Sequence, residues 1–306
     1  MEEKVIIGKD GPYPLEGILT IPDTGKDKYP AVVFVHGSGP SDKDETVFKL
    51  TPFGDLAKGL VKHDIASIRY DKRTYRYSRE LRKKDLTINE ETIDDALLAS
   101  ELLRSDSRID SDNIFIIGHS MGAMLAPRID NEGGNYKGLI MMAGSPHRLE
   151  DIMIRQIKEA GNTKNILLKA IVKLEEKVYL RKFINLYDLS DEQARNMRFA
   201  GNISLYYFKD MGRKTASDYL KENDKPVLIM QGARDFQVSL EEDFNEFKRQ
   251  LKDRNNIEYR LYDNLNHVFV EALYDDVLKA NKEYNVERHI GEDVIGDIAD
   301  FIHSHL

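Results

Sequence analysis

The pentapeptide Gly-His-Ser-Met-Gly at residues 118–122 contains a serine whose surroundings could make it a nucleophile. The pattern Gly-x-Ser-x-Gly is weak alone, since about one chain in ten of this length would carry it by chance. Here it follows an apolar run at 114–117 and precedes a helical pattern from Ala123. A serine between a buried strand and a helix sits on a sharp turn, and flanking glycines let the backbones approach. We therefore predict a nucleophile elbow that exposes the hydroxyl of Ser120 at the carboxyl edge of a sheet.

Two further residues could activate this serine, which is a weak nucleophile without a neighbouring base. Asp235 follows the apolar strand expected at 226–232, and His267 follows the strand expected at 257–262. Both therefore lie at the carboxyl ends of strands, on the edge where Ser120 is expected. We predict that His267 accepts the proton of Ser120 and later gives it to the leaving group. Asp235 is expected to orient the imidazole and stabilise its charged form.

The glycine-rich segment at 36–40, HGSGP, is a candidate oxyanion loop. It lies between an apolar strand and a helix, so its backbone N–H groups could point at a substrate carbonyl oxygen. We predict that the N–H groups of Met121 and Ser38 form the oxyanion hole, with Gly37 or Gly39 as the alternative second donor. One such donor contributes roughly 3–4 kcal/mol of transition-state stabilisation. The other interpretation is that these glycines only form the turn.

The elements that must position these residues alternate along the chain. Strands are expected at 3–8, 14–21, 30–35, 65–70, 113–118, 137–144, 226–232 and 257–262. Thr51 and Pro52 are expected to begin a helix as N-cap and first helical residue, and 87–90 reads as a capping box before a second helix. A last amphipathic helix is expected at 287–306. Continuously apolar strands that alternate with helices predict an α/β fold, with a mostly parallel sheet flanked by helices on both faces.

Residues 146–222 interrupt this alternation, because they show helical patterns and no clear strand. They carry 15 Lys and Arg against 11 Asp and Glu, a local charge of +4, which leaves −12 for the rest of a chain of net charge −8. We predict an inserted helical cap between two parts of the core, 1–145 and 223–306. The charge difference has two interpretations, a solvated helical surface or a cap that favours anionic or polar substrates.

The chain resembles the α/β-hydrolase serine esterases, in the branch shared with prolyl-oligopeptidase-like and serine-aminopeptidase-like hydrolases. The resemblance covers nearly the whole chain and depends on HGSGP at 36–40, RYDKR at 69–73, GHSMG at 118–122, AGSP at 143–146, GARDFQV at 232–238 and NLNHVF at 264–269. The order Ser, Asp, His along the chain is also that of this fold. The pattern is similar to that of small bacterial acyl esterases with a helical cap, and cinnamoyl and feruloyl esterases share much of it. The resemblance implies a carboxylic ester substrate with a short or aromatic acyl group, a cap that forms the acyl pocket, and no metal requirement.

Composition argues against several other classes of function. The net charge of −8 disfavours an electrostatic nucleic-acid binder, and the absence of cysteine excludes disulfides, Cys-ligated zinc and thiol catalysis. No apolar run approaches the roughly 20 residues that span a bilayer. The N-terminal sequence MEEKVIIGKDG has neither the basic nor the apolar region of a signal peptide. We expect a cytoplasmic enzyme without cofactor or metal that acts on a small-molecule ester; a homo-oligomer is left open.

Some residues keep two interpretations. The cap tyrosines Tyr206 and Tyr207 either contact the acyl group or form part of the cap core. The charged segment at 69–73 either braces a loop through ion pairs or contacts substrate, and we favour bracing. His119 and His36 are expected to pack and hydrogen-bond rather than to transfer protons.

Two rival functions accompany the leading hypothesis of a carboxylesterase that forms an acyl-enzyme on Ser120. An aminopeptidase or acyl-peptide hydrolase would use the same triad. An aminopeptidase also needs an acidic anchor for the substrate's amino group, and no cap carboxylate stands out in the sequence. A catalytically inactive binding protein is the other rival, and the intact Ser, Asp, His and glycine loop argue against it.

Overall fold

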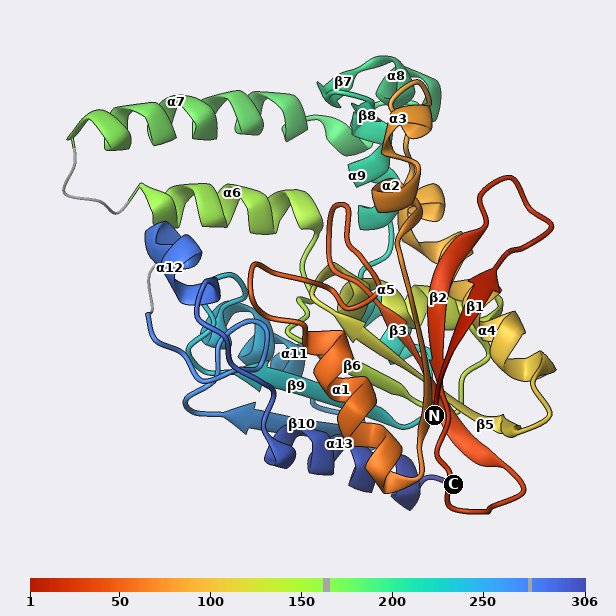
Figure 1. The fold of residues 1–306 in the computed structure, drawn as a ribbon. Coiled ribbons are helices and arrows are strands. Elements are labelled where there is room, and N and C mark those ends of the chain that lie inside the picture. The colour runs from red at the N-terminus through yellow and green to blue at the C-terminus, as the bar shows by residue number, and fades with distance from the viewer. Residues whose placement is uncertain (162–165, 275–276) are drawn as a thin grey trace.

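An eight-stranded sheet forms the centre of the protein in the computed structural model, which describes residues 1–161, 166–274 and 277–306 (Figure 1). The strand order is β1-β2-β4-β3-β5-β6-β9-β10. The bounds are β1 Glu2–Ile7, β2 Leu15–Thr20, β3 Tyr29–Val35, β4 Ala66–Tyr70, β5 Ile109–His119, β6 Leu139–Met142, β9 Val227–Gly232 and β10 Ile257–Tyr262. β2 pairs antiparallel with both of its neighbours, and all other neighbouring strands are parallel. The mostly parallel sheet and its eight expected strands are confirmed.

Helices cover both faces of this sheet (Figure 1). Val33 and Val35 of β3 belong to the apolar cluster that includes α4 (Asp94–Ser105) and α5 (Met121–Ile129). The alternate residues Val32 and Phe34 belong to the cluster that includes α1 (Pro52–Leu60) and α13 (Glu292–Ser304). Because successive side chains of a strand point to opposite faces, a strand covered on both faces is continuously apolar.

Shorter helical segments connect these elements. The short α-helices outside the insertion are α2 Arg73–Arg76, α3 Ser78–Leu81, α11 Asn245–Gln250 and α12 Ala280–Tyr284. Single 3₁₀ or π turns occur at Val61–His63, Asn89–Ile93, Asp130–Gly134, Leu186–Asp188, Leu240–Phe244 and Val277–Lys279.

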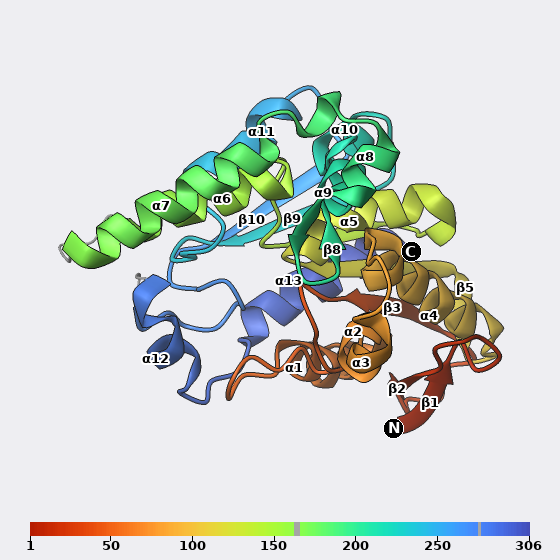
Figure 2. The ribbon, with the colours of Figure 1, turned by 90° about the horizontal axis from the view of Figure 1, so that it is seen from above.

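The segment between β6 and β9 forms a mainly helical insertion. Its helices are α6 Leu149–Ala160, α7 Ile166–Phe183, α8 Asp191–Asn196, α9 Leu205–Gly212 and α10 Ala216–Lys221. The expectation of no strand here is wrong, because β7 (Arg198–Ala200) and β8 (Ile203–Ser204) pair antiparallel around Gly201, whose φ of +54° suits glycine. α6 and α7 lie side by side and project away from the sheet (Figure 2).

The base of the insertion shares an apolar core with the sheet. Phe183, Leu205 and Phe208 are buried in the same cluster as Val33 and the residues of α5. Burying one such side chain contributes about 1.5–3 kcal/mol. This packing fixes α9 and the end of α7 against the core.

Two helix starts differ from the sequence expectation. Thr51 and Pro52 take the predicted positions, but the Thr51 side chain makes no capping hydrogen bond, and its carbonyl oxygen accepts the N–H of Asp55. At the expected capping box, the Glu90 carboxylate accepts hydrogen bonds from the N–H and hydroxyl of Thr87. Among the described residues no backbone N–H donates to the Thr87 hydroxyl in return, and the helix begins with a π turn before α4.

Candidate active site

The chain turns sharply at Ser120, between β5 and α5. Ser120 has φ 54° and ψ −118°, a combination that non-glycine residues rarely adopt and that costs of order 1–3 kcal/mol. A Cβ atom on Gly122 would lie 2.1 Å from the carbonyl oxygen of Val35, and one on Gly118 would lie 2.3 Å from the carbonyl oxygen of Gly122. Backbone contact therefore restricts both positions to glycine, and the turn has the form expected of a nucleophile elbow.

His267 and Asp235 form a hydrogen-bonded pair, with 2.7 Å between Nδ1 of the imidazole and Oδ2 of the carboxylate. The Oδ1 atom of Asp235 accepts the backbone N–H groups of Gln237 at 2.7 Å and Val238 at 3.0 Å. The Gln231 amide donates to Oδ2 at 3.1 Å. Because Nδ1 of His267 faces an acceptor, it carries the proton, and Nε2 is left as the basic nitrogen.

The loop after β10 holds His267 in place through the buried Asn266. The side-chain carbonyl of Asn266 accepts the N–H groups of Val268 at 3.1 Å and Val270 at 3.3 Å. Its amide donates to the buried carboxylate of Glu283 in α12 at 2.6 Å. α12 therefore supports the loop that carries the imidazole.

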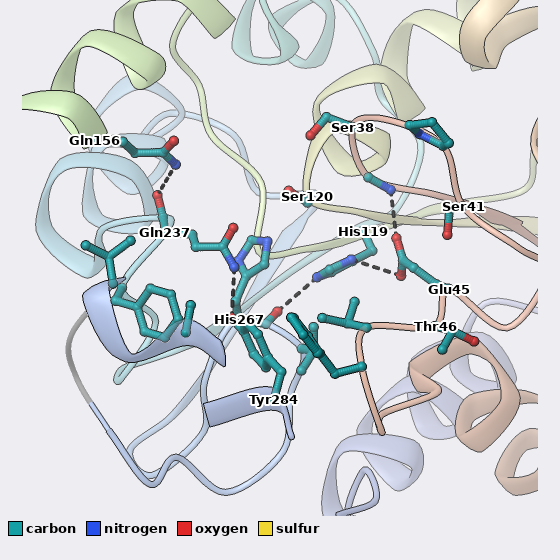
Figure 3. A pocket seen from close by; sticks show the side chains of 18 of the residues that line it. Ser38, Ser41, Glu45, Thr46, His119, Ser120, Gln156, Gln237, His267 and Tyr284 are labelled. Atoms are coloured by element: carbon teal, nitrogen blue, oxygen red, sulfur yellow. Dashed lines mark hydrogen bonds and ion pairs between the residues drawn. The ribbon is translucent and has the colours of Figure 1, made fainter. Parts of the chain in front are cut away.

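A cavity of about 380 Å³ lies at the carboxyl edge of the sheet, and Ser120 and His267 both line it (Figure 3). Its apolar and aromatic lining comprises Val47, Phe48, Phe236, Val268, Val277, Ala280 and Tyr284. Among the described residues, no hydrogen bond joins the Ser120 hydroxyl to the His267 imidazole. Such a bond is often long or poorly aligned before substrate binds.

Two carboxylates accept hydrogen bonds from the glycine N–H groups of the loop at 36–40. The N–H of Gly37 donates to Oε1 of Glu45 at 2.7 Å, and the N–H of Gly39 donates to Oε1 of Glu91 at 2.9 Å. Neither of the alternative oxyanion donors is therefore available to a substrate in this conformation.

The N–H groups of Ser38 and Met121 make no hydrogen bond to any described part of the chain. Ser38 lines the cavity, and Met121 directly follows Ser120 as the first residue of α5. An N–H at the start of a helix has no partner within the helix and carries a partial positive charge. These two groups remain the candidate donors for an oxyanion.

The charged segment at 69–73 lies beneath this loop and is paired within the protein. The buried ammonium group of Lys72 donates to the carbonyl oxygen of Gly37 at 2.8 Å and to Glu91 at 2.9 Å. The other ion pairs are Arg69 with Glu2 and Asp44, Asp71 with Lys43, and Arg73 with Asp94 and Asp95. Burial alone would raise the pKa of Glu91, but the charge and hydrogen bond of Lys72, together with the hydrogen bonds from Tyr207 and Gly39, hold that pKa below its ordinary value. These contacts agree with the bracing interpretation.

A second pair of carboxylate and imidazole, Glu45 and His119, lies beside the elbow (Figure 3). Oε2 of Glu45 is 3.0 Å from Nδ1 of His119, and Nε2 of His119 is 2.9 Å from the carbonyl oxygen of His267. Both side chains are buried. Burial would lower the pKa of His119, but the negative charge of Glu45 at ion-pair distance raises that pKa above its ordinary value. The sequence did not single out Glu45, whose only signal is an acidic residue shortly after the glycine loop.

Helix α6 of the insertion supplies Gln156 and Glu159 to the cavity wall. The Gln156 amide donates to the carbonyl oxygen of Gln237, two residues after Asp235, at 2.8 Å. Glu159 makes no hydrogen bond or ion pair with another described residue, and burial raises its pKa. The sequence did not single out a cap carboxylate, although the spacing of three residues places both side chains on one helix face.

Neither of the cap tyrosines Tyr206 and Tyr207 lines this cavity. Tyr207 is buried, and its hydroxyl donates to Oε2 of Glu91 at 2.8 Å. Tyr206 packs under Arg195, whose guanidinium carbon is 3.5 Å from the ring centroid. The acyl contact, which was one of the two interpretations, is therefore not made in this cavity, because α9 turns Tyr207 toward the core and Tyr206 toward charged residues of the insertion. The cap-core alternative holds for Tyr207.

Within the described parts of the chain, no group of three or more His, Cys, Asp and Glu could hold a metal ion. No described helix is long and apolar enough to cross a membrane. No Lys or Arg side chain is among the described residues that line the cavity. The described Lys and Arg side chains of the insertion therefore lie away from the cavity, which favours the solvated-surface interpretation.

Residues 29–271 match the family described as serine aminopeptidase, S33. The chain is 32% identical over 285 residues to Esterase EstD of Thermotoga maritima. This alignment covers 93% of the chain but only 64% of that relative.

Several solved structures share the fold at low sequence identity. Est1E from Butyrivibrio proteoclasticus is 16% identical with a TM-score of 0.59, over 99% of this chain and 98% of that one. The Pyrococcus furiosus esterase PF2001 is 18% identical with a TM-score of 0.57, over 99% and 91% of the two chains. The acylaminoacyl peptidase of Pyrococcus horikoshii is 15% identical with a TM-score of 0.59, over 99% of this chain and 41% of that one. The predicted α/β-hydrolase fold is confirmed.

Proposed function

The chain belongs to the serine aminopeptidase family S33, and on this basis we propose that it is a serine carboxylesterase that forms an acyl-enzyme on Ser120. The observation that carries this proposal is the cavity that Ser120 shares with the hydrogen-bonded pair His267 and Asp235. The likeness to a relative named as an esterase supports it.

In the acylation step, Oγ of Ser120 attacks the carbonyl carbon of the ester as Nε2 of His267 takes the hydroxyl proton. The carbonyl oxygen becomes an oxyanion, and the N–H groups of Ser38 and Met121 stabilise it. Asp235 stabilises the imidazolium that forms. The bond from carbon to the alkoxy oxygen then breaks, the alcohol leaves with the proton from His267, and the acyl group stays on Ser120.

In the deacylation step, water attacks the acyl carbon as His267 accepts one of its protons. The bond to Oγ breaks, Ser120 recovers its proton from His267, and the carboxylic acid leaves. No metal or cofactor takes part in either step.

The shape and charge of the cavity support a short or aromatic acyl group. A volume of about 380 Å³ suits a small ligand, and Phe48, Phe236 and Tyr284 supply aromatic surface. The carboxylate of Glu159, which has no ion pair among the described residues, disfavours an anionic acyl group at this site. We further propose that residues 146–222 act as a cap on a core formed by 1–145 and 223–306, since α6 supplies one wall.

The proposal is tested with p-nitrophenyl esters from acetate to octanoate and with methyl ferulate. The wild type is compared with Ser120→Ala and with Ser41→Ala, a control serine that lines the same cavity. We expect Ser120→Ala to lower kcat by about 10⁴-fold or more and Ser41→Ala to retain turnover. Ester turnover that survives Ser120→Ala, or a wild type that hydrolyses no ester, would overturn the proposal.

Glu159 favours a second candidate function, the hydrolysis of aminoacyl substrates. Its carboxylate lines the cavity without an ion pair among the described residues, so it could bind a substrate ammonium group. Alanine methyl ester and methyl isobutyrate differ only by an ammonium in place of a methyl group and separate the two functions. An aminoacyl hydrolase would prefer alanine methyl ester to methyl isobutyrate and would also cleave alanine p-nitroanilide. In such an enzyme, Glu159→Gln would abolish the preference for the alanine ester. An esterase would show no such preference.

A further inference from the structure

The carboxylate of Glu45 connects the three segments that carry the proposed catalytic groups. Its Oε1 accepts the N–H of Gly37 in the oxyanion loop at 2.7 Å, and its Oε2 is 3.0 Å from Nδ1 of His119, which precedes Ser120. His119 continues to the next segment, because its Nε2 is 2.9 Å from the carbonyl oxygen of His267. Figure 3 shows this chain of contacts along one wall of the cavity.

Glu45 occupies its position at an energetic cost. Its backbone has φ +52°, a region that favours glycine, and its side chain is only 5% exposed. Burial of a carboxylate is unfavourable unless it is paired and hydrogen-bonded. Glycine or asparagine would satisfy the turn without either cost. The contacts of the carboxylate, rather than the shape of the turn, therefore account for a glutamate here.

The partners of His119 determine its protonation. Nε2 faces a backbone carbonyl oxygen, which can only accept a hydrogen bond, so Nε2 carries a proton. Nδ1 lies 3.0 Å from Oε2 of Glu45 without the alignment of a hydrogen bond, and a negative charge at that distance stabilises a proton on Nδ1. Both ring nitrogens then carry protons, and His119 is an imidazolium ion beside Ser120. Burial opposes both shifts, yet the pKa of His119 is raised and the pKa of Glu45 is lowered, which agrees with this assignment.

We propose that Glu45 is a positioning residue of the reaction, which fixes the loop that presents the Ser38 N–H and holds His119 as a cation beside the nucleophile. The proposal rests on the esterase function proposed above. Glu45 acts through Gly37 and His119 rather than through the reacting atoms. Donors that are fixed in place before the oxyanion forms stabilise it without reorganisation during the reaction.

Other ionisable groups face this pair. The rings of His119 and His267 have centroids 4.8 Å apart, and the charge of Asp235 also raises the pKa of His119. On the side of Glu45, burial lowers the pKa of His36 to about 4, so His36 is neutral at pH 7. The charge of Lys72 also lowers the pKa of His36, and Lys72 is itself paired with Glu91 at 2.9 Å. Glu45 is therefore the anion in contact with His119.

The test compares Glu45→Gln and Glu45→Ala with the wild type. Glutamine keeps an acceptor for the Gly37 N–H but loses the charge that pairs with His119, whereas alanine loses both. We expect kcat for p-nitrophenyl acetate to fall about tenfold in the glutamine variant and about 100-fold in the alanine variant, with KM nearly unchanged. The matched control is Asp130→Asn, which removes the buried partner of a half-buried ion pair with Lys225 away from the cavity and should lower stability without lowering kcat.

A pH profile separates positioning from a merely structural role. The wild-type kcat/KM should fall at alkaline pH as His119 loses its second proton, and this fall should be absent in Glu45→Gln. Nitrogen NMR of His119, assigned with a His119→Gln variant, should show imidazolium at pH 7 in the wild type and neutral imidazole in Glu45→Gln.

Any of three results would overturn the proposal. These are an unchanged kcat in both Glu45 variants, a loss of kcat that Asp130→Asn reproduces, and a neutral His119 in the wild type. Failure of the esterase function is a distinct result. In that case the wild type hydrolyses no ester, and the NMR measurement alone still decides whether Glu45 holds His119 as a cation.

Discussion

Replacement of Asp235 by asparagine should disable His267 while leaving the fold nearly intact. The two backbone N–H groups of Gln237 and Val238 point at Oδ1 and would hold the amide carbonyl oxygen there. A flipped amide would lose both hydrogen bonds, at about 0.5–1.5 kcal/mol each. The amide nitrogen must therefore take the place of Oδ2, where it faces Nδ1 of His267.

This orientation determines the catalytic effect. An amide N–H that faces Nδ1 makes Nδ1 the acceptor and places the single imidazole proton on Nε2. Nε2 of His267 can then no longer accept the proton of Ser120. Loss of the correct tautomer in a triad lowers kcat by about 10⁴-fold, which corresponds to about 5.4 kcal/mol.

The assay is kcat for p-nitrophenyl acetate at pH 7.5, with circular dichroism and a thermal melt to confirm that Asp235→Asn is folded. Part of any fall in stability would come from the Gln231 amide, which donates to Oδ2 in the wild type and would face another donor in the variant. A folded variant whose kcat stays within about tenfold of the wild type would refute this account of the tautomer.

Three further predictions concern the supports of the site. Gly122→Ala should abolish folding or lower Tm strongly, because the added Cβ would meet the carbonyl oxygen of Val35. The control Gly296→Ala adds a Cβ where there is open space, so it should melt at or above the wild-type temperature. Equal melting temperatures of the two variants would contradict the contact at Gly122. Glu91→Gln leaves the buried ammonium of Lys72 without its charge partner and should reduce the free energy of unfolding in urea by about 3–5 kcal/mol. The folded-state pKa of Glu91 is lowered, so the ionised carboxylate stabilises the fold above the unfolded-state pKa, and this stabilisation is lost as pH falls toward the folded-state pKa. If the free energy of unfolding of Glu91→Gln depends on acid pH as that of the wild type does, this explanation is excluded. Tyr207→Phe should lower stability by about 1 kcal/mol and leave the acyl-chain profile of KM unchanged, and an altered profile would instead indicate contact with substrate.

The backbone positions of the catalytic residues could be predicted from sequence, because they depend on residues that are adjacent along the chain. Ser120, Asp235 and His267 each follow a strand at the carboxyl edge, and the glycines around Ser120 indicate the sharp turn. The choice between Ser38 and its neighbouring glycines could not be made from sequence. It depends on two carboxylates that fold back onto the loop, Glu45 from eight residues further along the chain and Glu91 from a distant segment.

Side-chain direction in the insertion was the least predictable feature. Tyr207 and Tyr206 are adjacent on α9, so they point about 100° apart, and tertiary packing decides which one is buried. Glu159 was missed because helical spacing shows which residues share a face but not what that face meets. The role of α6 as a cavity wall appears only when α6 and the loop after β9 come together, as the contact between Gln156 and Gln237 shows.

The division of the insertion into a fixed base and a projecting helical pair has a consequence for how this protein could acquire new substrates. The residues that support Ser120, Asp235 and His267 belong mainly to the strands, their loops, α5 and α12, whereas α6 forms part of the cavity wall. Natural variation or laboratory recombination could therefore replace α6 and α7 as a module while the reaction machinery is inherited unchanged. Two positions are exceptions and must be kept in any exchanged module. Gln156 donates to the loop that carries Asp235, and Arg155 pairs with the buried carboxylate of Asp243.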